Sequence, residues 1–196
     1  MSRDRILASV KASQPAFSVL PDLSSFGGGS TTSLEKFVSV LRAIGSTVLK
    51  ADDMPMAIVE LQKSFSPGQR VVNAIEGFPV GEYITSSTDG HGLENVYLSI
   101  IEGEFGVAEN GAIWIPESKM GVRALPFICE QLAIILLCDN VAPTLHEAYE
   151  KIGSANHGFG AFIAGPSKTA DIEQSLVLGA HGAKRLTVIL VGLNGD

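Results

Sequence analysis

The chain has 196 residues, of which 45% are hydrophobic, and its 14 basic and 21 acidic side chains give a formal net charge of −7. A chain of this length can bury roughly 70% of its unfolded surface, which predicts a folded core and not a disordered polypeptide. The acidic excess would be repelled by nucleic acid, so no nucleic-acid partner is expected. The longest clean apolar run, residues 132–138, is far shorter than the roughly 20 residues of a membrane helix, so no membrane span is expected.

The cysteines and the N-terminal residues indicate a cytoplasmic protein. Cys129 and Cys138 lie in apolar stretches, where reduced core thiols are expected instead of a disulfide. An iron–sulfur cluster usually takes about four thiolates, so this chain alone is expected to hold no such cofactor. Residues 1–11 are charged and amphipathic and lack an apolar stretch of signal-peptide length.

The first residues predict a helix and a flexible connection. Residues 3–11 place their apolar side chains on one helical face. Residues 13–33 are rich in turn formers and contain a glycine run that lacks the Lys-Ser/Thr pair of a phosphate-binding loop. We therefore expect residues 1–31 to form an N-terminal helix and a flexible connection, and residues 32–196 to form a single α/β domain.

Three further patterns predict the ends of helices. Thr32 and Glu35 form a capping box that begins a helix with a buried apolar stripe, and Gly45 is placed to end it. Thr144 and Glu147 form another capping box. Predicted helices occupy residues 53–64, 144–152 and 168–178, and predicted strands occupy residues 46–49, 71–75, 96–101, 112–115, 132–137, 159–164 and 186–191.

The closing order of strand, helix, strand, helix and strand defines the predicted fold class. Short links between these elements favour a βαβαβ unit, and the uninterrupted hydrophobicity of residues 132–137 is typical of a buried parallel strand. The predicted architecture is α/β, with a mostly parallel sheet covered by helices on both faces.

The segment Gly165–Glu173 is the first candidate site. It follows a predicted strand, and ligands of parallel sheets bind beyond the carboxyl ends of strands. Ser167 is placed as the N-cap of the predicted helix, whose free N–H groups favour an anion. The alternative is purely structural, because a capping serine and the nearby acids Asp171 and Glu173 stabilise a helix start without any ligand.

The turn Glu109-Asn110-Gly111 is the second candidate site. Its carboxylate is either a solvated turn residue or a base or nucleophile held at a sheet edge. Among the histidines, His146 is expected on the surface, whereas His157 and His181 flank the last two predicted strands and could share a crevice. Their spacing predicts no metal site.

Two C-terminal stretches carry a resemblance to a known family. Residues 162–173 read FIAGPSKTADIE and residues 178–191 read LGAHGAKRLTVILV, which closely resembles the C-terminal signature of the lactate-utilisation protein C family, whose members share the LUD domain. The turn at residues 108–111 and the helix near residues 145–148 are similar to further motifs of that family. The resemblance extends from about Val96 to the end.

The resemblance implies a fold and a function. The fold is that of ribose-5-phosphate isomerase, glucosamine-6-phosphate deaminase and the CoA transferases (NagB/RpiA/CoA-transferase-like). The function is that of one component of a three-protein system that oxidises L-lactate to pyruvate, in which the other two proteins carry the iron–sulfur clusters. CoA transferases of related fold use a glutamate nucleophile in a Glu-x-Gly turn, which Glu109-Asn110-Gly111 resembles.

Three functional hypotheses follow. The chain is a non-cluster component of lactate oxidation with iron–sulfur partner proteins, an enzyme acting on a small acid or CoA ester with Glu109 as the catalytic residue, or a binding module for a small carboxylate or sugar phosphate. A homo-oligomer is compatible with each of them. The expected ligand-binding residues are Asn110, Gly111, Gly165, Pro166, Ser167, Thr169, Asp171, Glu173 and His181.

Overall fold

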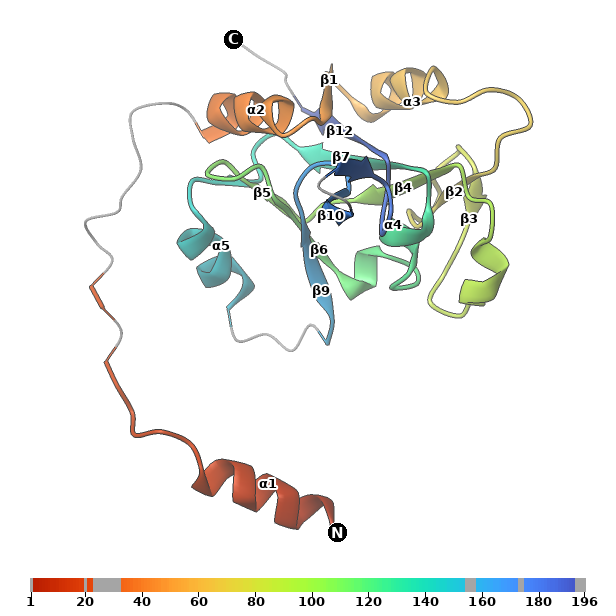
Figure 1. Ribbon diagram of the computed structural model, residues 1–196. Coiled ribbons are helices and arrows are strands. Elements are labelled where there is room, and N and C mark those ends of the chain that lie inside the picture. The colour runs from red at the N-terminus through yellow and green to blue at the C-terminus, as the bar shows by residue number, and fades with distance from the viewer. Residues whose placement is uncertain (1, 20, 23–32, 154–157, 173–174, 193–196) are drawn as a thin grey trace.

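A six-stranded, fully parallel sheet forms the centre of the protein (Figure 1). The computed structural model describes residues 2–19, 21–22, 33–153, 158–172 and 175–192. The sheet has the strand order β1-β12-β7-β4-β2-β3. Its strands are β1 (Thr47–Ala51), β2 (Val71–Asn73), β3 (Glu82–Tyr83), β4 (Leu98–Glu102), β7 (Gln131–Leu137) and β12 (Arg185–Val191). The apolar run predicted as the central strand is β7, which pairs with β12 on one side and β4 on the other.

Helices cover both faces of this sheet, which confirms the predicted α/β class. Phe37 of α2 packs in one core with Ile134 of β7, and Leu61 of α3 packs in a second core with the next residue of that strand, Ile135. Because successive side chains of a strand point to opposite faces, α2 and α3 lie on opposite sides of the sheet, flanking β1 and β12 in Figure 1. The helices are α1 (Arg3–Ala12), α2 (Ser33–Ala43), α3 (Met54–Gln62), α4 (Leu125–Ile128) and α5 (Leu145–Ile152), with short 3-10 turns η2 (Gly90–Leu93) and η3 (Glu117–Lys119).

A second, four-stranded sheet packs on the face that α2 covers. Its order is β8-β5-β6-β9, with strands β5 (Phe105–Val107), β6 (Ile113–Pro116), β8 (Val141–Ala142) and β9 (Gly160–Ile163). Ile113 and Ile115 of β6 share a core with Phe37 and the central strand. The strand predicted at 159–164 is β9, but it pairs antiparallel with β6 and does not join the parallel sheet. The predicted βαβαβ unit is therefore wrong, although β7 and β12 are parallel neighbours.

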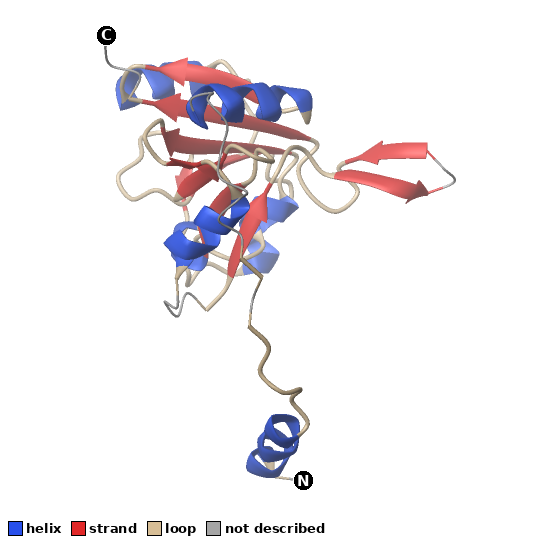
Figure 2. Cartoon of the chain, turned by 90° about the vertical axis from the view of Figure 1, so that its left-hand side faces the viewer, coloured by secondary structure: helices blue, strands red, loops and turns tan. Residues whose placement is uncertain are grey.

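Residues predicted as a helix at 168–178 instead form an antiparallel hairpin of β10 (Lys168–Ile172) and β11 (Ser175–Leu178). Figure 2 shows this hairpin extending away from both sheets. Its base is fixed by non-local bonds, because the Ser167 N–H donates to the Ala183 carbonyl over 2.9 Å and the Ser167 carbonyl accepts from the Gly179 N–H over 3.0 Å. Ser167 consequently joins two chain segments and does not cap a helix.

The predicted helix ends at Gly45 and Thr144 are confirmed. Gly45 ends α2 with a φ of +96°, a conformation that glycine adopts without steric cost. The Asp53 carboxylate accepts from the Met56 N–H at the start of α3. Thr144 accepts from the Glu147 N–H at the start of α5, as the capping box requires. Thr32 of the first capping box lies outside the described residues, and α1 forms as predicted, with no buried residue.

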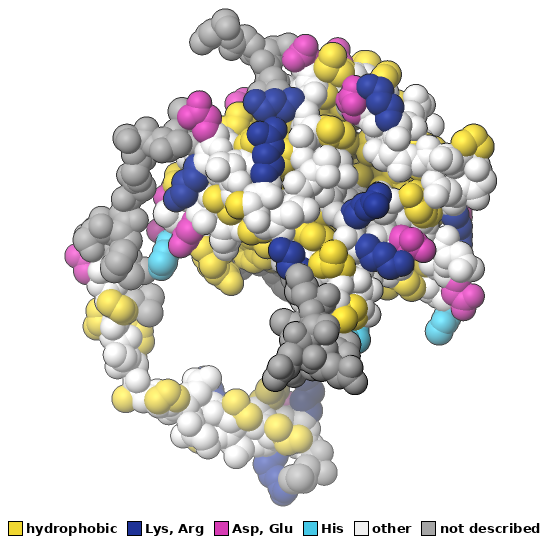
Figure 3. All heavy atoms as spheres, turned by 45° about the horizontal axis from the view of Figure 1, so that its top comes forward, with side chains coloured by type: hydrophobic (Ala, Val, Ile, Leu, Met, Phe, Trp, Pro, Cys, Tyr) yellow, Lys and Arg dark blue, Asp and Glu magenta, His cyan; other side chains and the backbone are white. Residues whose placement is uncertain are grey.

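Three further features of the described residues are the surface charges, the cysteines and the lengths of the helices. On the face drawn in Figure 3, Lys and Arg side chains are scattered among acidic and apolar ones. Cys129 and Cys138 are free and buried, as predicted, and burial raises the pKa of each thiol, so both favour the protonated form. Among the described helices, none has the length and apolar character needed to cross a bilayer.

Candidate functional site

A cavity of about 370 Å³ lies at the base of the projecting hairpin. We call it the hairpin-base cavity. Apolar side chains of α4, β9 and the two central strands form part of its wall, and the turns on both sides of the hairpin supply its polar groups. The lining residues are Pro126, Phe127, Leu132, Phe162, Ile163, Ala164, Gly165, Pro166, Ser167, Lys168, His181, Gly182, Ala183 and Leu186.

The structure thus brings together both halves of the C-terminal segment. The sequence predicts ligand-binding roles for Gly165, Pro166, Ser167 and His181. All four residues line this cavity. The two turns are close because Gly182 has no side chain: a Cβ there would lie 3.2 Å from the Ser167 Cβ. The backbone bonds of Ser167 hold the turns in this arrangement.

Ile44, at the end of α2, connects this cavity to the other candidate turn. The Lys168 ammonium donates to the Ile44 carbonyl over 2.7 Å, which satisfies an acceptor left free at the helix end. A Cβ on Gly165 would lie 3.1 Å from the same carbonyl oxygen, and a Cβ on Gly111 would lie 3.0 Å from the Ile44 Cδ1. Both glycines have a positive φ, which the turns need and which glycine adopts without steric cost. Both also lie close to Ile44, so a side chain at either position would crowd that residue.

Glu109 has a defined structural partner outside the cavity. Its Oε2 accepts from the Leu145 N–H over 2.8 Å, at the first residue of α5, where a carboxylate interacts favourably with the helix dipole. Asn110 accepts from the Ala112 N–H over 3.0 Å and shapes the turn. Glu109 and Asn110 are exposed and do not line the hairpin-base cavity.

The remaining predicted residues have different positions. Thr169 is half-buried in β10, opposite Val177 of β11. The backbone of Asp171 belongs to β10, whereas Glu173 and His157 lie outside the described residues. His146 is exposed, as predicted. No group of three His, Cys, Asp or Glu side chains suited to a metal ion occurs in the described part of the chain.

The start of β9, which contributes Phe162 to the cavity wall, is fixed by an ion pair. Arg123 donates to both carboxylate oxygens of Glu117, over 2.6 and 3.0 Å, and its guanidinium lies 5.2 Å from the centre of the Phe159 ring. The Glu117 carboxylate also accepts from the Phe159 N–H over 3.3 Å. The hydrogen bonds from Arg123 hold the pKa of Glu117 below its ordinary value.

The chemistry of the hairpin-base cavity is that of a binding pocket. It combines apolar walls with the Ser167 hydroxyl, the Lys168 ammonium and the His181 imidazole, a composition that suits a small polar or anionic molecule with an apolar part. Sequence reasoning missed Lys168, Phe127 and Ile44. Lys168 lies inside the recognised motif, but its role at the end of α2 depends on a contact between residues 124 positions apart.

Comparison with solved structures supports the fold. The chain is similar to the crystal structure of a DUF162 family protein from Deinococcus radiodurans, with a TM-score of 0.60 and 17% sequence identity. The similarity covers 82% of this chain and 96% of that one. At this level of identity, the likeness shows a shared fold.

Comparison of sequences identifies the family. The chain is 28% identical over 125 residues to lactate utilization protein C of Bacillus pumilus, covering 59% of this chain and 52% of the relative. It is 30% identical over 105 residues to lactate utilization protein C of Geobacillus kaustophilus, covering 50% of this chain and 43% of the relative. The chain thus spans about half the length of the curated relatives it matches. Residues 91–191 match the family model of the LUD domain, and the chain belongs to the LUD domain family.

Proposed function

We propose that this chain is the non-cluster component of a lactate-utilisation system, which oxidises L-lactate to pyruvate together with iron–sulfur partner proteins. The observation that carries the proposal is the family match over residues 91–191. All residues that line the hairpin-base cavity lie within this range. The names of the relatives from Bacillus and Geobacillus support the same role. The buried, reduced cysteines favour a cytoplasmic location for the system.

The role of this chain in such a system is to bind a small carboxylate in the hairpin-base cavity. L-Lactate and pyruvate each carry a carboxylate, a neighbouring oxygen and a methyl group. The Ser167 hydroxyl and the His181 imidazole offer hydrogen bonds to the oxygens, and the walls formed by Phe127 and Leu186 suit the methyl group. The Lys168 ammonium adds a positive charge at the cavity.

Genetic deletion tests the proposed role. Deletion of the gene in the native organism is expected to abolish growth on L-lactate while leaving growth on pyruvate unchanged. A tagged chain that restores growth is expected to co-purify with two cysteine-rich proteins from cells grown on L-lactate. Unchanged growth of the deletion strain on L-lactate would overturn the proposal.

A substitution at Gly182 tests whether the hairpin-base cavity takes part. Gly182→Val places a branched side chain between the two turns, beside Ser167, and is expected to prevent restoration of growth on L-lactate. Gly92→Val is the matched control, because a Cβ at Gly92 meets no atom within 4 Å. Ser167→Ala is a milder variant for the case in which the valine unfolds the chain, and circular dichroism checks folding. Full restoration by both Gly182→Val and Ser167→Ala would exclude the cavity.

A second candidate function is that of an enzyme for a small acid or its CoA ester, with Glu109 as nucleophile or base. The observation that favours it is the exposed Glu109 carboxylate in a Glu-x-Gly turn. Its test is turnover of short-chain acids and their CoA esters by the purified chain and by Glu109→Gln. Equal turnover by the two proteins would remove Glu109 from the mechanism.

A further inference from the structure

One edge of the parallel sheet is open to another chain. β1 is the first strand of the sheet and pairs with β12, and no strand of the described residues pairs with its other side. Figure 1 shows β1 at the border of the molecule, between α2 and α3. The opposite edge strand, β3, has two residues, and its Glu82 forms an ion pair with Arg70. β1 has five residues, with Lys50 as its one charged side chain. Because short and charged edge strands resist pairing with other chains, β1 is the edge that is suited to a partner.

The backbone groups that face the open side belong to Val48 and Lys50. The Ala51 carbonyl accepts from the Gly192 N–H, just beyond β12, so the backbone groups of Ala51 point toward that strand. Their direction alternates along a strand, so Leu49 also faces β12, whereas Val48 and Lys50 face outward. Each of these two residues therefore offers one donor and one acceptor to an added strand.

A groove of about 340 Å³ lies beside this edge, between α2 and Lys50 of β1. Two of its lining residues, Glu35 and Arg42, are exposed and have no ion pair among the residues that the structure describes. Glu35 lies in the first turn of α2 and Arg42 in the last. Their spacing is about two helical turns, so both lie on the same side of the helix. This side of α2 thus carries a negative charge at its start and a positive charge at its end.

Such a surface is complementary to a second copy of itself. A two-fold axis beside Val38, about midway between the two charges, brings Glu35 of each copy to the partner's Arg42. The same axis passes the middle of β1, because α2 packs against β1 and the chain reverses direction between them. Val48 then lies opposite the partner's Lys50. Because both residues point their backbone groups outward, they exchange N–H···O bonds in both directions.

α3 adds an apolar surface on the other face of the same edge. The side chains of Met56 and Val59 are 44% and 52% exposed, and they lie one turn apart on α3. The Met56 sulfur accepts from the Asp52 N–H over 3.5 Å, which places this side chain just beyond the end of β1. Leu49, half-buried, belongs to the core on this face of the sheet. A partner at the open edge would remove part of this apolar surface from water, which favours association.

We propose that two copies of this chain pair across the open edge of β1, with β1 antiparallel to the partner's β1 and α2 antiparallel to the partner's α2. The parallel sheet of one copy then continues into that of the other, and the two ion pairs between Glu35 and the partner's Arg42 fix the register. The interface is separate from the proposed ligand site, because no residue that lines the groove lines the hairpin-base cavity.

The mass of the full-length protein in solution tests the proposal. Light scattering after size-exclusion chromatography is expected to give twice the chain mass of 20.6 kDa. Sedimentation over a series of protein concentrations gives the dissociation constant of the dimer. A chain that stays monomeric at every concentration would refute the proposal.

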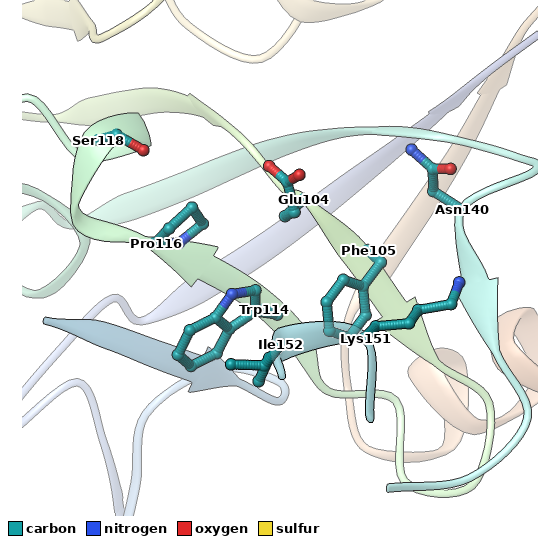
Figure 4. Close-up of a pocket in the computed structure, with 8 residues that line it drawn as sticks. All are labelled: Glu104, Phe105, Trp114, Pro116, Ser118, Asn140, Lys151 and Ile152. Atoms are coloured by element: carbon teal, nitrogen blue, oxygen red, sulfur yellow. The ribbon is translucent and has the colours of Figure 1, made fainter. Parts of the chain in front are cut away.

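Charge reversal locates the interface. Arg42→Glu replaces two attractive contacts by two repulsive ones and is expected to weaken the dimer by at least about tenfold. Lys151→Glu is the matched control, because Lys151 also lies in the last turn of a helix, and Figure 4 shows it at a different cavity, on the four-stranded sheet. Glu35→Arg combined with Arg42→Glu exchanges the two charges and is expected to restore the dimer. Both changes oppose the helix dipole, so recovery reports pairing between copies and not a more stable α2.

A proline tests the backbone pairing. Lys50→Pro removes an outward N–H and no hydrogen bond of the parallel sheet, and proline is tolerated in edge strands of this kind. We expect it to weaken the dimer by at least about tenfold, whereas Lys50→Ala, which keeps the N–H, retains the dimer. Circular dichroism checks that each variant is folded. An unchanged dissociation constant in folded Arg42→Glu or Lys50→Pro, or a charge exchange that leaves the dimer as weak as Arg42→Glu does, contradicts the proposed interface.

Discussion

Replacing Gly165 by alanine tests the contact that positions the hairpin-base cavity. Gly165 has a φ of +75°, and a left-handed backbone costs an L-residue about 1–2 kcal/mol. The added Cβ would also lie 3.1 Å from the Ile44 carbonyl oxygen, closer than an ordinary van der Waals contact. Crowding of a packed site adds about 1 kcal/mol or more. We therefore expect Gly165→Ala to lower the free energy of unfolding by about 2–3 kcal/mol.

Gly68→Ala separates the two contributions. Gly68 has a φ of +89°, but a Cβ there meets no atom within 4 Å, so this variant carries only the backbone cost of about 1–2 kcal/mol. Urea denaturation of the three proteins at one pH gives the free energies, and the shift of the midpoint is the more precise measure. If both alanine variants lose the same stability, Ile44 does not restrict this turn. If neither variant is destabilised, the positive φ values are wrong.

Further predictions concern the core, the Glu109 turn and the ion pair at β9. Phe37→Ala should lower the free energy of unfolding by about 3–5 kcal/mol, because Phe37 is fully buried; a loss below about 1 kcal/mol in urea denaturation would contradict the described core. Glu109→Gln should cost about 0.3–1 kcal/mol in the same assay, since it removes the charge at the start of α5, and an increase in stability would count against that role. Because folding lowers the pKa of Glu117, this carboxylate adds stability at pH values above its unfolded pKa, near 4.5, and the gain is lost as the pH falls through the lower folded value. The stability difference between the wild type and Glu117→Gln should therefore shrink on acidification below pH 4.5, and a difference that stays constant from neutral to acidic pH would refute the ion-pair argument.

Local signals in the sequence predict the elements of this fold that depend on nearby residues. The capping box at Thr144 and the glycine at the end of α2 each act within a few residues, and each is found where it was expected. The central strand β7 is predicted by its uninterrupted hydrophobicity, which reflects burial on both faces of a parallel sheet.

Elements that depend on distant contacts were not predictable in the same way. The hydrophobicity of residues 159–164 indicates a strand but does not say which sheet receives it, and β9 pairs with β6. The segment after it reads as a capped helix because Ser167 and the following acids are typical of a helix start. The bonds of Ser167 to Ala183 and Gly179 override that preference and fix a hairpin.

The candidate site is also predictable from nearby residues but not from distant contacts. The motif predicts that Gly165, Pro166, Ser167 and His181 act together, and they line one cavity. The remaining wall could not be deduced, because α4 and the strands β7 and β12 approach the motif only in the folded chain.

The place of β12 in the parallel sheet has a consequence for synthesis on the ribosome. β12 lies between β1 and β7, although more than a hundred residues separate it from β1. Until residues 185–191 have left the exit tunnel, β1 has no partner strand within the parallel sheet and β7 has an open edge. Unpaired edges of this kind invite pairing with other chains. The nascent protein is therefore expected to depend on chaperones until β12 inserts, and to gain most of its protease resistance in that single step.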